Sequence, residues 1–575
     1  MKLIRFAFTC SRKVPFYAHL CNRYLDYPEL DVTVGWKDNT FILEAEGNQT
    51  QLEALASSIS SDFLLSCWLT GAKMDVVDSR VGNKSPIKHA PFQLPFCSRC
   101  HTSFSDNQSP QFGELDLACP VCHGERHSSA SLTFSLLSQH AAEFLESGRT
   151  QLSLNGHTYT FGINPVEPGV RNQILVTNPN RLNNHFAVEN RHVLALSSIE
   201  KPRLTLRPSD NQSGLTDPLY DVCFAWNREI SVFAELLRQR GIDHIYYASA
   251  ALQPAMAWVE NGWSQIDNPR FAAKPSAINC VGEPLHEAAT IRGLRASWAK
   301  GTIRFDFSDT GDSSSRESQA ICALHGGSVE SGILRNTAVI YFSNQAPGQL
   351  VTLDRTLNTE SFFMLRPLPE AGSAVLELVE QEGHHELLAR FRQQFPEDCD
   401  ALAAYSFTGF RDNLTTLYAA AAFILGLAHS AMTKDQLADT VLAAALKYRG
   451  KNSHRIDFAF DNNPDISGLD FTKTLASLMA FRLGTDGDEG HTPKLAFGLM
   501  DSLADYLSNW IEHLDGNIGL SSITLAGNEL ANEVLANRIS LRVGKNFPLF
   551  VNRRLTLDGS NLSAGALFLK QRRRG

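Results

Sequence analysis

Four of the chain's eleven cysteines stand in two Cys-x-x-Cys pairs within CSRCHTSFSDNQSPQFGELDLACPVC, residues 97–122. Each pair presents two thiolates from one tight turn, and two such turns together form a tetrahedral four-sulfur cage that suits zinc. Eighteen residues separate Cys100 from Cys119, a spacing typical of a zinc ribbon. Because Cys97, Cys100, Cys119 and Cys122 fill every position of that cage, the sequence predicts one structural zinc, with no position open to substrate.

Two alternatives to this metal site are open at the level of sequence. His101 and His123 stand beside the pairs, so either one of them replaces a cysteine ligand or both are solvated neighbours. An iron–sulfur cluster is a further alternative, because cysteine spacing alone does not identify the metal.

The size and composition of the chain narrow its class. At 575 residues it exceeds what one hydrophobic core usually organises, and 43% hydrophobic with 20% charged residues is typical of a globular protein. A net charge of −9 argues against nucleic acid as the main partner, because duplex binding needs clustered Lys and Arg. We find no signal-peptide apolar region and no run of about 18 apolar residues, so we expect a cytoplasmic protein without a membrane segment. The seven cysteines outside the pairs stand singly, which favours buried thiols in a reducing compartment.

Hydrophobic patterning divides the chain into four predicted domains. Residues 1–82 follow the order strand, helix, strand, strand, helix, strand, which predicts a ferredoxin-like split β-α-β fold. A turn-rich stretch leads into the cysteine segment, so we expect the zinc ribbon to occupy 83–127. Residues 128–285 mix strands with helices, one of which should end at Gly148, as in an α/β domain. Residues 286–575 begin with strands, become strongly helical and end in a strand–turn–helix unit. The expected fold class is therefore a multidomain mixture of α/β and α+β.

The order of these parts resembles the hydrogenase maturation carbamoyltransferases (HypF). Near the C-terminus, ITLAGNELANEVLANRI stands where the family has a strand followed by Ser-Gly-Gly-Val-Phe-Gln-Asn, and LTLDGSNLSAGA where it has Pro-Asn-Asp-Gly-Gly. NHFAV and SSIEKPRLTL are similar to the Lys-Pro-Phe-Ala-Val and Ser-x-x-x-x-Pro-Ile-Val-Leu segments of its YrdC-like domain. The resemblance implies an acylphosphatase-like domain at 1–82, a YrdC-like domain at 128–285, and a carbamoyltransferase domain at 286–575. The last belongs to the actin/sugar-kinase superfamily, which implies two linked lobes.

The resemblance also implies a reaction. In such families the first domain resembles a hydrolase of carbamoyl phosphate, and the YrdC-like domain makes carbamoyl adenylate with ATP. The last domain passes the carbamoyl group to a cysteine of a partner protein during maturation of a nickel–iron site. The implied partners are therefore a maturation factor or its client protein, and carbamoyl phosphate where the chain is active.

The phosphate loop of the first domain departs from the family pattern. Where the family has Gly-x-Val-Gln-Gly-Val-Gly-Phe-Arg, this chain has TCSRKVPFYAHL, with no glycine, with Pro15, and with Tyr17 about where the arginine should stand. Arg12 and Lys13 remain as cations. Because proline removes an N–H donor, the loop cannot close tightly around phosphate, and we expect a retained scaffold without hydrolysis.

The nucleotide motifs survive only in part. The YrdC-like segment keeps one arginine of a basic cluster and one serine of Thr-Ser-Gly-Asn, which leaves little charge for a polyphosphate. The last domain lacks the family's His-His-His-Ala-His run and Gly-Thr-Gly-Tyr-Gly turn, but keeps one glycine of a pair and an Asp-Gly dipeptide. Glycines there let backbone N–H groups approach phosphate, so ATP stays among the interpretations. The candidate nucleotide-binding residues are Arg181, Ser249, Gly527, Asn528, Asp558 and Gly559.

Two hypotheses about function follow. The first is a HypF-like protein related to carbamoyl transfer in metalloenzyme maturation, whose phosphate and metal motifs are degraded. The second is a non-catalytic, zinc-stabilised scaffold that binds a maturation partner protein.

Overall fold

The computed structural model describes residues 2–92, 94–122, 132–210, 214–251, 253–266, 276–279, 282–307, 318–333, 335–428, 431–450, 452–461, 468–485 and 489–569. The chain divides into two compact units. Unit 1 comprises Met1–Pro168 and Asn172–Pro254, and unit 2 comprises Gly169–Arg171 and Ala255–Gly575.

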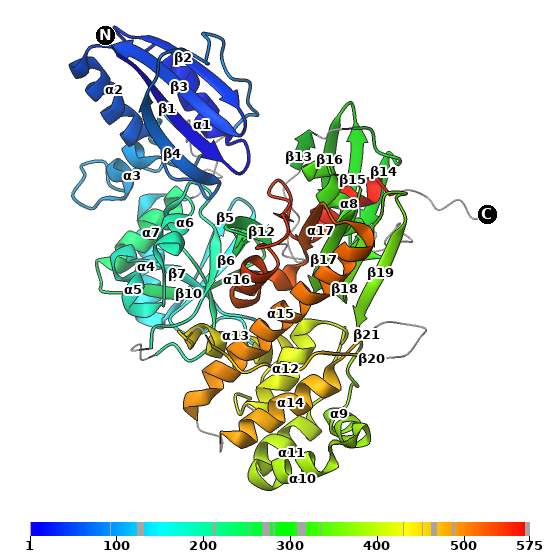
Figure 1. The fold of residues 1–575 in the computed structure, drawn as a ribbon. Helices are drawn as coiled ribbons and strands as arrows, with labels where there is room; N and C mark the ends of the chain where they lie inside the picture. The colour runs from blue at the N-terminus through cyan, green and yellow to red at the C-terminus, as the bar shows by residue number, and fades with distance from the viewer. Residues whose placement is uncertain are drawn as a thin grey trace. The chain divides into compact units, whose positions relative to one another are not determined.

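Unit 1 begins with a four-stranded antiparallel sheet and two helices, drawn in blue in Figure 1. Its elements are β1 (Lys2–Cys10), α1 (Pro15–Tyr24), β2 (Asp31–Lys37), β3 (Thr40–Gly47), α2 (Gln49–Asp62) and β4 (Leu69–Val76). The strand order β2-β3-β1-β4 places the first and last strands side by side, as in a split β-α-β fold. Helix α2 begins at a capping box. The Asn48 side chain accepts a hydrogen bond from the Gln51 amide, and the Gln51 side chain accepts one from the Asn48 amide.

The remainder of unit 1 is an α/β layer structure preceded by the short helix α3 (Ser98–Ser105) of the cysteine segment. Its six strands follow the order β8-β9-β7-β10-β6-β5, and β7 and β9 are parallel. Helix α4 ends at Gly148 in a left-handed conformation (φ 72°), as the sequence predicts. The elements are α4 (Phe134–Ser147), β5 (Arg149–Leu154), β6 (His157–Gly162), β7 (Gln173–Val176), η1 (Pro179–Arg181), α5 (Leu182–His185), α6 (Asn190–Ser197), β8 (Arg203–Leu206), β9 (Tyr220–Cys223), α7 (Arg228–Arg238) and β10 (His244–Ser249).

Unit 2 contains a hairpin, two sheets of unequal size and most of the helices. Its first elements are β11 (Ala255–Val259), β12 (Gly262–Ile266), β13 (Ser276–Asn279), β14 (Ala288–Ile291), β15 (Leu294–Ala299), β16 (Thr302–Phe307), α8 (Gln319–Ser331), β17 (Thr337–Ser343), β18 (Ala346–Leu353) and β19 (Thr359–Leu365). The helical part comprises α9 (Gly372–Val379), η2 (Glu380–His384), α10 (His385–Gln394), α11 (Pro396–Ala404), α12 (Leu414–Ile424), α13 (Lys434–Lys447), α14 (Phe471–Gly484), η3 (Glu489–His491) and α15 (Thr492–Ile518), with β20 (Ala459–Asp461) and β21 (Gly468–Asp470) between α13 and α14. The chain ends with β22 (Ser522–Ala526), η4 (Asn528–Ala531), α16 (Glu533–Arg542), β23 (Leu549–Phe550) and α17 (Gly559–Leu567).

The larger sheet of unit 2 has the order β20-β21-β19-β18-β17-β22-β23. Strands β17, β18 and β19 are antiparallel neighbours, whereas β22 pairs with β17 in parallel and β23 pairs with β22 in parallel. The smaller sheet, β13-β16-β15-β14, is antiparallel in its described pairs and packs with α8 and α17. Figure 1 shows α9 to α12 and α14 gathered at one end of the larger sheet.

Two apolar cores hold unit 2 together. The larger joins the helices α9 to α16 to one side of the seven-stranded sheet, and the smaller joins α8 and α17 to the four-stranded sheet and to β17 and β18. The alanine-rich helix α12 lies almost wholly within the larger core, because its small side chains allow close helix packing. The single cysteines in the described part of the chain are buried thiols: Cys10, Cys21, Cys67, Cys223, Cys322 and Cys399.

The predicted mixed α/β multidomain fold is thus confirmed.

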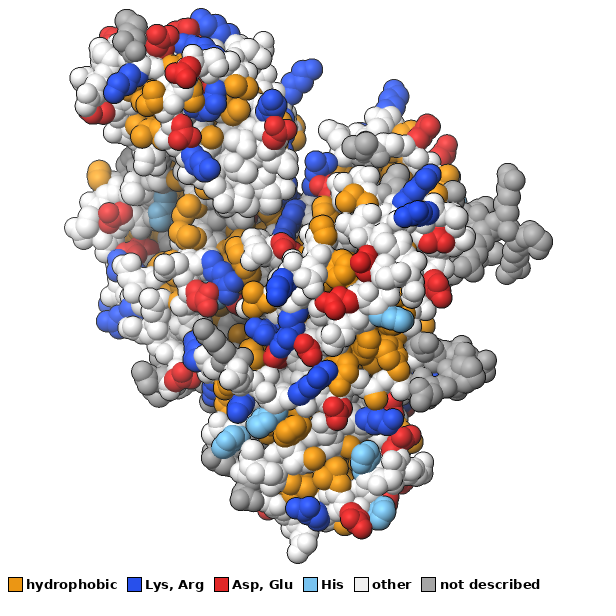
Figure 2. Space-filling view, viewed as in Figure 1, with side chains coloured by type: hydrophobic (Ala, Val, Ile, Leu, Met, Phe, Trp, Pro, Cys, Tyr) orange, Lys and Arg blue, Asp and Glu red, His pale blue; other side chains and the backbone are white. Residues whose placement is uncertain are grey.

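Figure 2 shows Lys and Arg side chains interspersed with Asp and Glu on the face drawn. Of the described helices, none combines the length and the apolar character that crossing a membrane requires.

Candidate metal centre and nucleotide-site residues

The structure brings the four paired cysteines together. Their sulfur atoms all lie within 4.8 Å of one another, and all four side chains are buried. The Sγ–Sγ distances are 3.6 Å for Cys97 to Cys119, 3.8 Å for Cys100 to Cys122 and 3.9 Å for Cys97 to Cys100. A tetrahedral zinc with Zn–S bonds of about 2.3 Å needs sulfur–sulfur edges of about 3.8 Å. The geometry therefore fits a four-coordinate ion of zinc's size.

The local backbone explains how the first pair is held. Cys97 caps helix α3, and its own amide donates to the Sγ of Cys100 at 3.2 Å. The amide of His101 donates to the Cys97 carbonyl at 2.9 Å, which closes the turn. Hydrogen bonds from Cys100 and Cys122 to the sulfur of Cys97 hold the pKa of the Cys97 thiol well below its usual value, whereas the pKa of Cys100 is raised to about 11.

His101 does not belong to the sulfur cluster. Its ring lies 4.8 Å from the Phe96 ring and 5.5 Å from the Phe104 ring, and it bonds to the Ser105 hydroxyl at 3.2 Å. Burial lowers its pKa to about 4, so the imidazole is neutral. His123 lies outside the described residues.

Arg228 links the cysteine segment to helix α7, a role that the sequence analysis missed. Its guanidinium donates to the carbonyls of Pro95 (2.8 Å), Leu115 (2.9 Å) and Leu117 (2.6 Å) and reaches the Sγ of Cys100 at 4.0 Å. A sequence signal was available, because a cation in the first turn of a helix opposes the helix dipole and so indicates a partner elsewhere.

The loop between β1 and α1 is packed rather than open. The guanidinium of Arg12 lies 3.9 Å from the centre of the Trp68 ring, and burial lowers its pKa. Tyr17, which stands where the family has arginine, is fully buried and donates its hydroxyl to the Leu64 carbonyl at 2.6 Å. Pro15 opens helix α1, where its missing N–H costs nothing.

The structure does not bring Arg181 and Ser249 together. Arg181 forms an ion pair with Asp243 at 3.2 Å, just before strand β10. Ser249 ends that strand, and its hydroxyl accepts from the Ala251 amide at 3.1 Å. Six residues of extended chain separate Asp243 from Ser249, which is about 20 Å at 3.3 Å per residue.

The four candidates of unit 2 do gather at the carboxyl ends of β17 and β22. Gly527 has φ 100°, and a Cβ there would lie 2.0 Å from the Phe342 carbonyl oxygen, so its glycine is required by strand packing. The Asn528 side chain accepts from the Asn344 amide at 3.0 Å and donates to the Asn344 side chain at 2.8 Å. Both residues are therefore engaged within the protein.

Asp558 lies at the centre of a buried polar network, and Gly559 follows it as the first residue of α17. The carboxylate of Asp558, with 0% exposure, accepts from Tyr341 at 3.0 Å and Ser343 at 2.8 Å and pairs with Arg292. Its oxygen atoms are thus used by neighbours rather than left for a ligand. Arg292 lies 266 residues away in sequence, so no local motif reveals the pair.

Glu529 is a second residue that sequence reasoning missed. Its carboxylate accepts from the amides of Leu414 (3.1 Å) and Thr415 (2.6 Å) and from the Thr415 hydroxyl (2.7 Å), at the N-terminus of α12. Burial raises the pKa of Glu529 to about 7, although the hydrogen bonds from these donors act in the opposite direction. The available signal was the acidic side chain itself, which stands where the resembled family has valine.

No protein-family model matches the chain. The crystal structure of full-length HypF in the phosphate- and nucleotide-bound form matches with a TM-score of 0.61 at 10% identity, over 99% of this chain and 98% of that one. HypF of T. kodakarensis matches with a TM-score of 0.58 at 12% identity, over 99% and 98%.

These matches define the class as a multidomain protein with the HypF fold, as the sequence resemblance predicts. At such identities they establish the fold alone. Among curated proteins, Protein HydE of Wolinella succinogenes is 28% identical over 173 residues, which is 30% of this chain. The matched stretch spans about a third (31%) of that relative's length.

Proposed function

We propose that this chain is a HypF-like maturation protein that works by binding a partner protein and does not itself transfer carbamoyl groups. The observation that carries the proposal is the internal engagement of the phosphate and nucleotide candidates. In unit 2 the carboxylate of Asp558 is bound by three neighbours. In unit 1 Arg181 pairs with Asp243 just before β10, whereas Ser249 is the last residue of that strand.

The four-cysteine cluster is proposed to hold one structural zinc. The burial of all four sulfurs and their mutual distances support this assignment, and four sulfurs leave no open position for a reacting water. The proposed domains are an acylphosphatase-like domain at 1–82, a zinc ribbon at 83–127, a YrdC-like domain at 128–285 and a carbamoyltransferase-like domain at 286–575. A cytoplasmic location and a maturation factor or its client as partner stay predictions. ATP, which the sequence offered as a possible ligand, is not part of this proposal.

Complementation of a deletion strain tests the proposal. Loss of the gene should impair assembly of a nickel–iron enzyme, measured as its activity and nickel content, and the wild-type gene should restore both. The double variant Arg181→Ala, Ser249→Ala removes the YrdC-like nucleotide candidates at exposed and half-buried positions, so it should fold and complement fully. The matched variant Cys97→Ser, Cys100→Ser removes metal ligands and should fail.

Ligand binding provides the second arm. Saturating Mg-ATP and carbamoyl phosphate should leave the thermal unfolding of the purified chain unchanged. A ligand at 100 times its Kd would add about 2.7 kcal/mol to the stability of the folded state, which is readily measured. A clear upward shift, or failure of the Arg181→Ala, Ser249→Ala variant to complement, would instead support carbamoyl transfer; normal maturation in the deletion strain would exclude a maturation role.

A further inference from the structure

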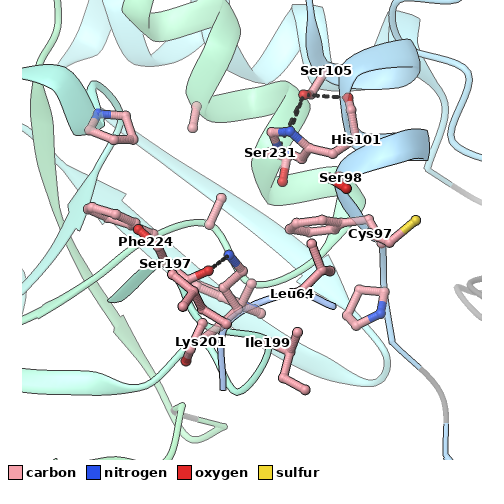
Figure 3. Close-up of a pocket in the computed structure, with 18 of the residues that line it drawn as sticks. Leu64, Cys97, Ser98, His101, Ser105, Ser197, Ile199, Lys201, Phe224 and Ser231 are labelled. Atoms are coloured by element: carbon pink, nitrogen blue, oxygen red, sulfur yellow. Dashed lines mark hydrogen bonds between the residues drawn. The ribbon is translucent and has the colours of Figure 1, made fainter. Parts of the chain in front are cut away.

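Unit 1 contains a cavity of about 580 Å³ that none of the nucleotide candidates lines. It opens at the carboxyl ends of the parallel strands β7 and β9, beside helix α7 and the segment that leads into Cys97 (Figure 3). Crevices at the carboxyl ends of parallel strands are the usual ligand positions in α/β sheets, and volumes of about 300–1,000 Å³ suit small molecules.

The walls of the cavity are largely apolar and aromatic. Phe63 and Leu64 reach it from the connection between α2 and β4, Phe96 from the cysteine segment, and Phe224 and Trp226 from the end of β9. Aromatic rings on several sides favour a ligand with a flat or compact apolar body.

Lys201 is one of two cations that line the cavity, the other being Arg238. Its amine donates to the Ser197 carbonyl at 3.2 Å and lies 5.4 Å from the centre of the Phe96 ring. In Figure 3 the Lys201 amine is directed toward the other lining side chains. Burial lowers its pKa to about 8, so it remains mostly protonated at pH 7.

Within the described residues no carboxylate forms a direct ion pair with Lys201, although the charge of Glu200 favours its protonated form. The neighbouring Glu200 is engaged by the Ser66 hydroxyl at 2.6 Å and the Cys67 amide at 2.9 Å. Glu235 and Arg238, which also line the cavity, pair with each other at 2.6 Å, and the candidate metal ligand Cys97 lines it as well. The Lys201 ammonium is therefore bound by one carbonyl and one aromatic ring without a direct ion pair, and an anion that enters the cavity can supply that partner in partly apolar surroundings.

We propose that this cavity binds a small organic monocarboxylate, whose carboxylate pairs with Lys201 and whose apolar body lies against Phe224 and Trp226. A single ammonium matches a single negative charge, whereas a polyphosphate needs several cations or a cradle of backbone amides. The inference is independent of the maturation role, because binding is measured on the isolated chain.

Calorimetric titration of the full chain with benzoate, and with benzamide as its neutral isostere, tests the proposal. Benzoate should bind at least tenfold more tightly than benzamide. Lys201→Met keeps the apolar stem and removes the charge, so it should abolish this preference, whereas Lys73→Met, an exposed lysine on β4, should preserve it.

The comparison of the two probes on the wild-type chain stands even where Lys201→Met fails to fold, and metal content with circular dichroism reports that failure. Equal binding of benzoate and benzamide, or binding of neither, overturns the proposal. An unchanged preference in a folded Lys201→Met variant also overturns it.

Discussion

Replacing Asp558 by asparagine separates a structural role from a ligand-binding role. The substitution keeps the size of the side chain but removes its charge and turns one acceptor oxygen into a donor amide. The amide can still accept from Tyr341 or Ser343 with its remaining oxygen. It cannot serve all three present donors, and it leaves the guanidinium of Arg292 without its carboxylate.

The structure sets the size of the effect. Removing one partner of a buried ion pair costs about 3–5 kcal/mol. The side chain of Arg292 keeps 22% exposure while that of Asp558 has none, so water relieves part of the cost and we expect about 3 kcal/mol. This loss should appear locally, in the stability of α17, because Asp558 directly precedes that helix.

Native-state hydrogen exchange measures that local stability without assuming two-state unfolding of a 575-residue chain. Amides of α17 should exchange roughly 100-fold faster in Asp558→Asn, which corresponds to about 3 kcal/mol. The double variant with Arg292→Met should lose less than the sum of the single variants, since the pair is shared. Unchanged exchange in Asp558→Asn, together with weakened binding of Mg-ATP, would refute the structural role.

Three further predictions concern the metal site and the polar contacts described above. The purified chain should carry one tightly held zinc per molecule by elemental analysis, and Cys97→Ser with Cys100→Ser should abolish it. Arg228→Ala should leave the buried Leu115 carbonyl and the half-buried Pro95 and Leu117 carbonyls without this donor, costing about 3 kcal/mol in the stability of the cysteine segment and speeding zinc transfer to a chelator. Because the pKa of Glu529 rises from 4.5 to about 7 on folding, stability should fall by up to about 3 kcal/mol as pH rises through that window. Glu529→Gln should flatten this part of the stability profile in urea titrations, and an unchanged slope would contradict the assignment.

Much of the fold could be predicted from local sequence. The alternation of strands and helices in 1–82 predicts the observed strand order, because a split β-α-β arrangement places the first and last strands side by side. The cysteine spacing likewise brings four sulfurs together, since each Cys-x-x-Cys turn positions its own pair and the cage needs two of them. The helix stop at Gly148 follows from the freedom of glycine to adopt positive φ.

The contacts that decide the candidate sites are not local, and sequence reasoning missed them. Arg292 and Asp558 are 266 residues apart, and the Leu414 amide and Glu529 are 115 residues apart. Motif matching identifies a glycine or an aspartate as retained, but it cannot tell whether that residue faces a ligand. At Gly527 the retained glycine is explained by the Phe342 carbonyl, which is a packing constraint that persists when a ligand is lost.

The candidate sites differ in whether their charged groups find partners within the protein. A helix N-terminus attracts an anion, and a buried carboxylate or ammonium needs a partner of opposite charge or several hydrogen bonds. In unit 2 these requirements are met from within, by Glu529 at α12 and by Arg292 at Asp558. In unit 1 the ammonium of Lys201 contacts one carbonyl and an aromatic ring, makes no direct ion pair with a described carboxylate, and lines the cavity. Because no described carboxylate forms a direct ion pair with this ammonium, a ligand carboxylate can bind it without displacing a protein carboxylate.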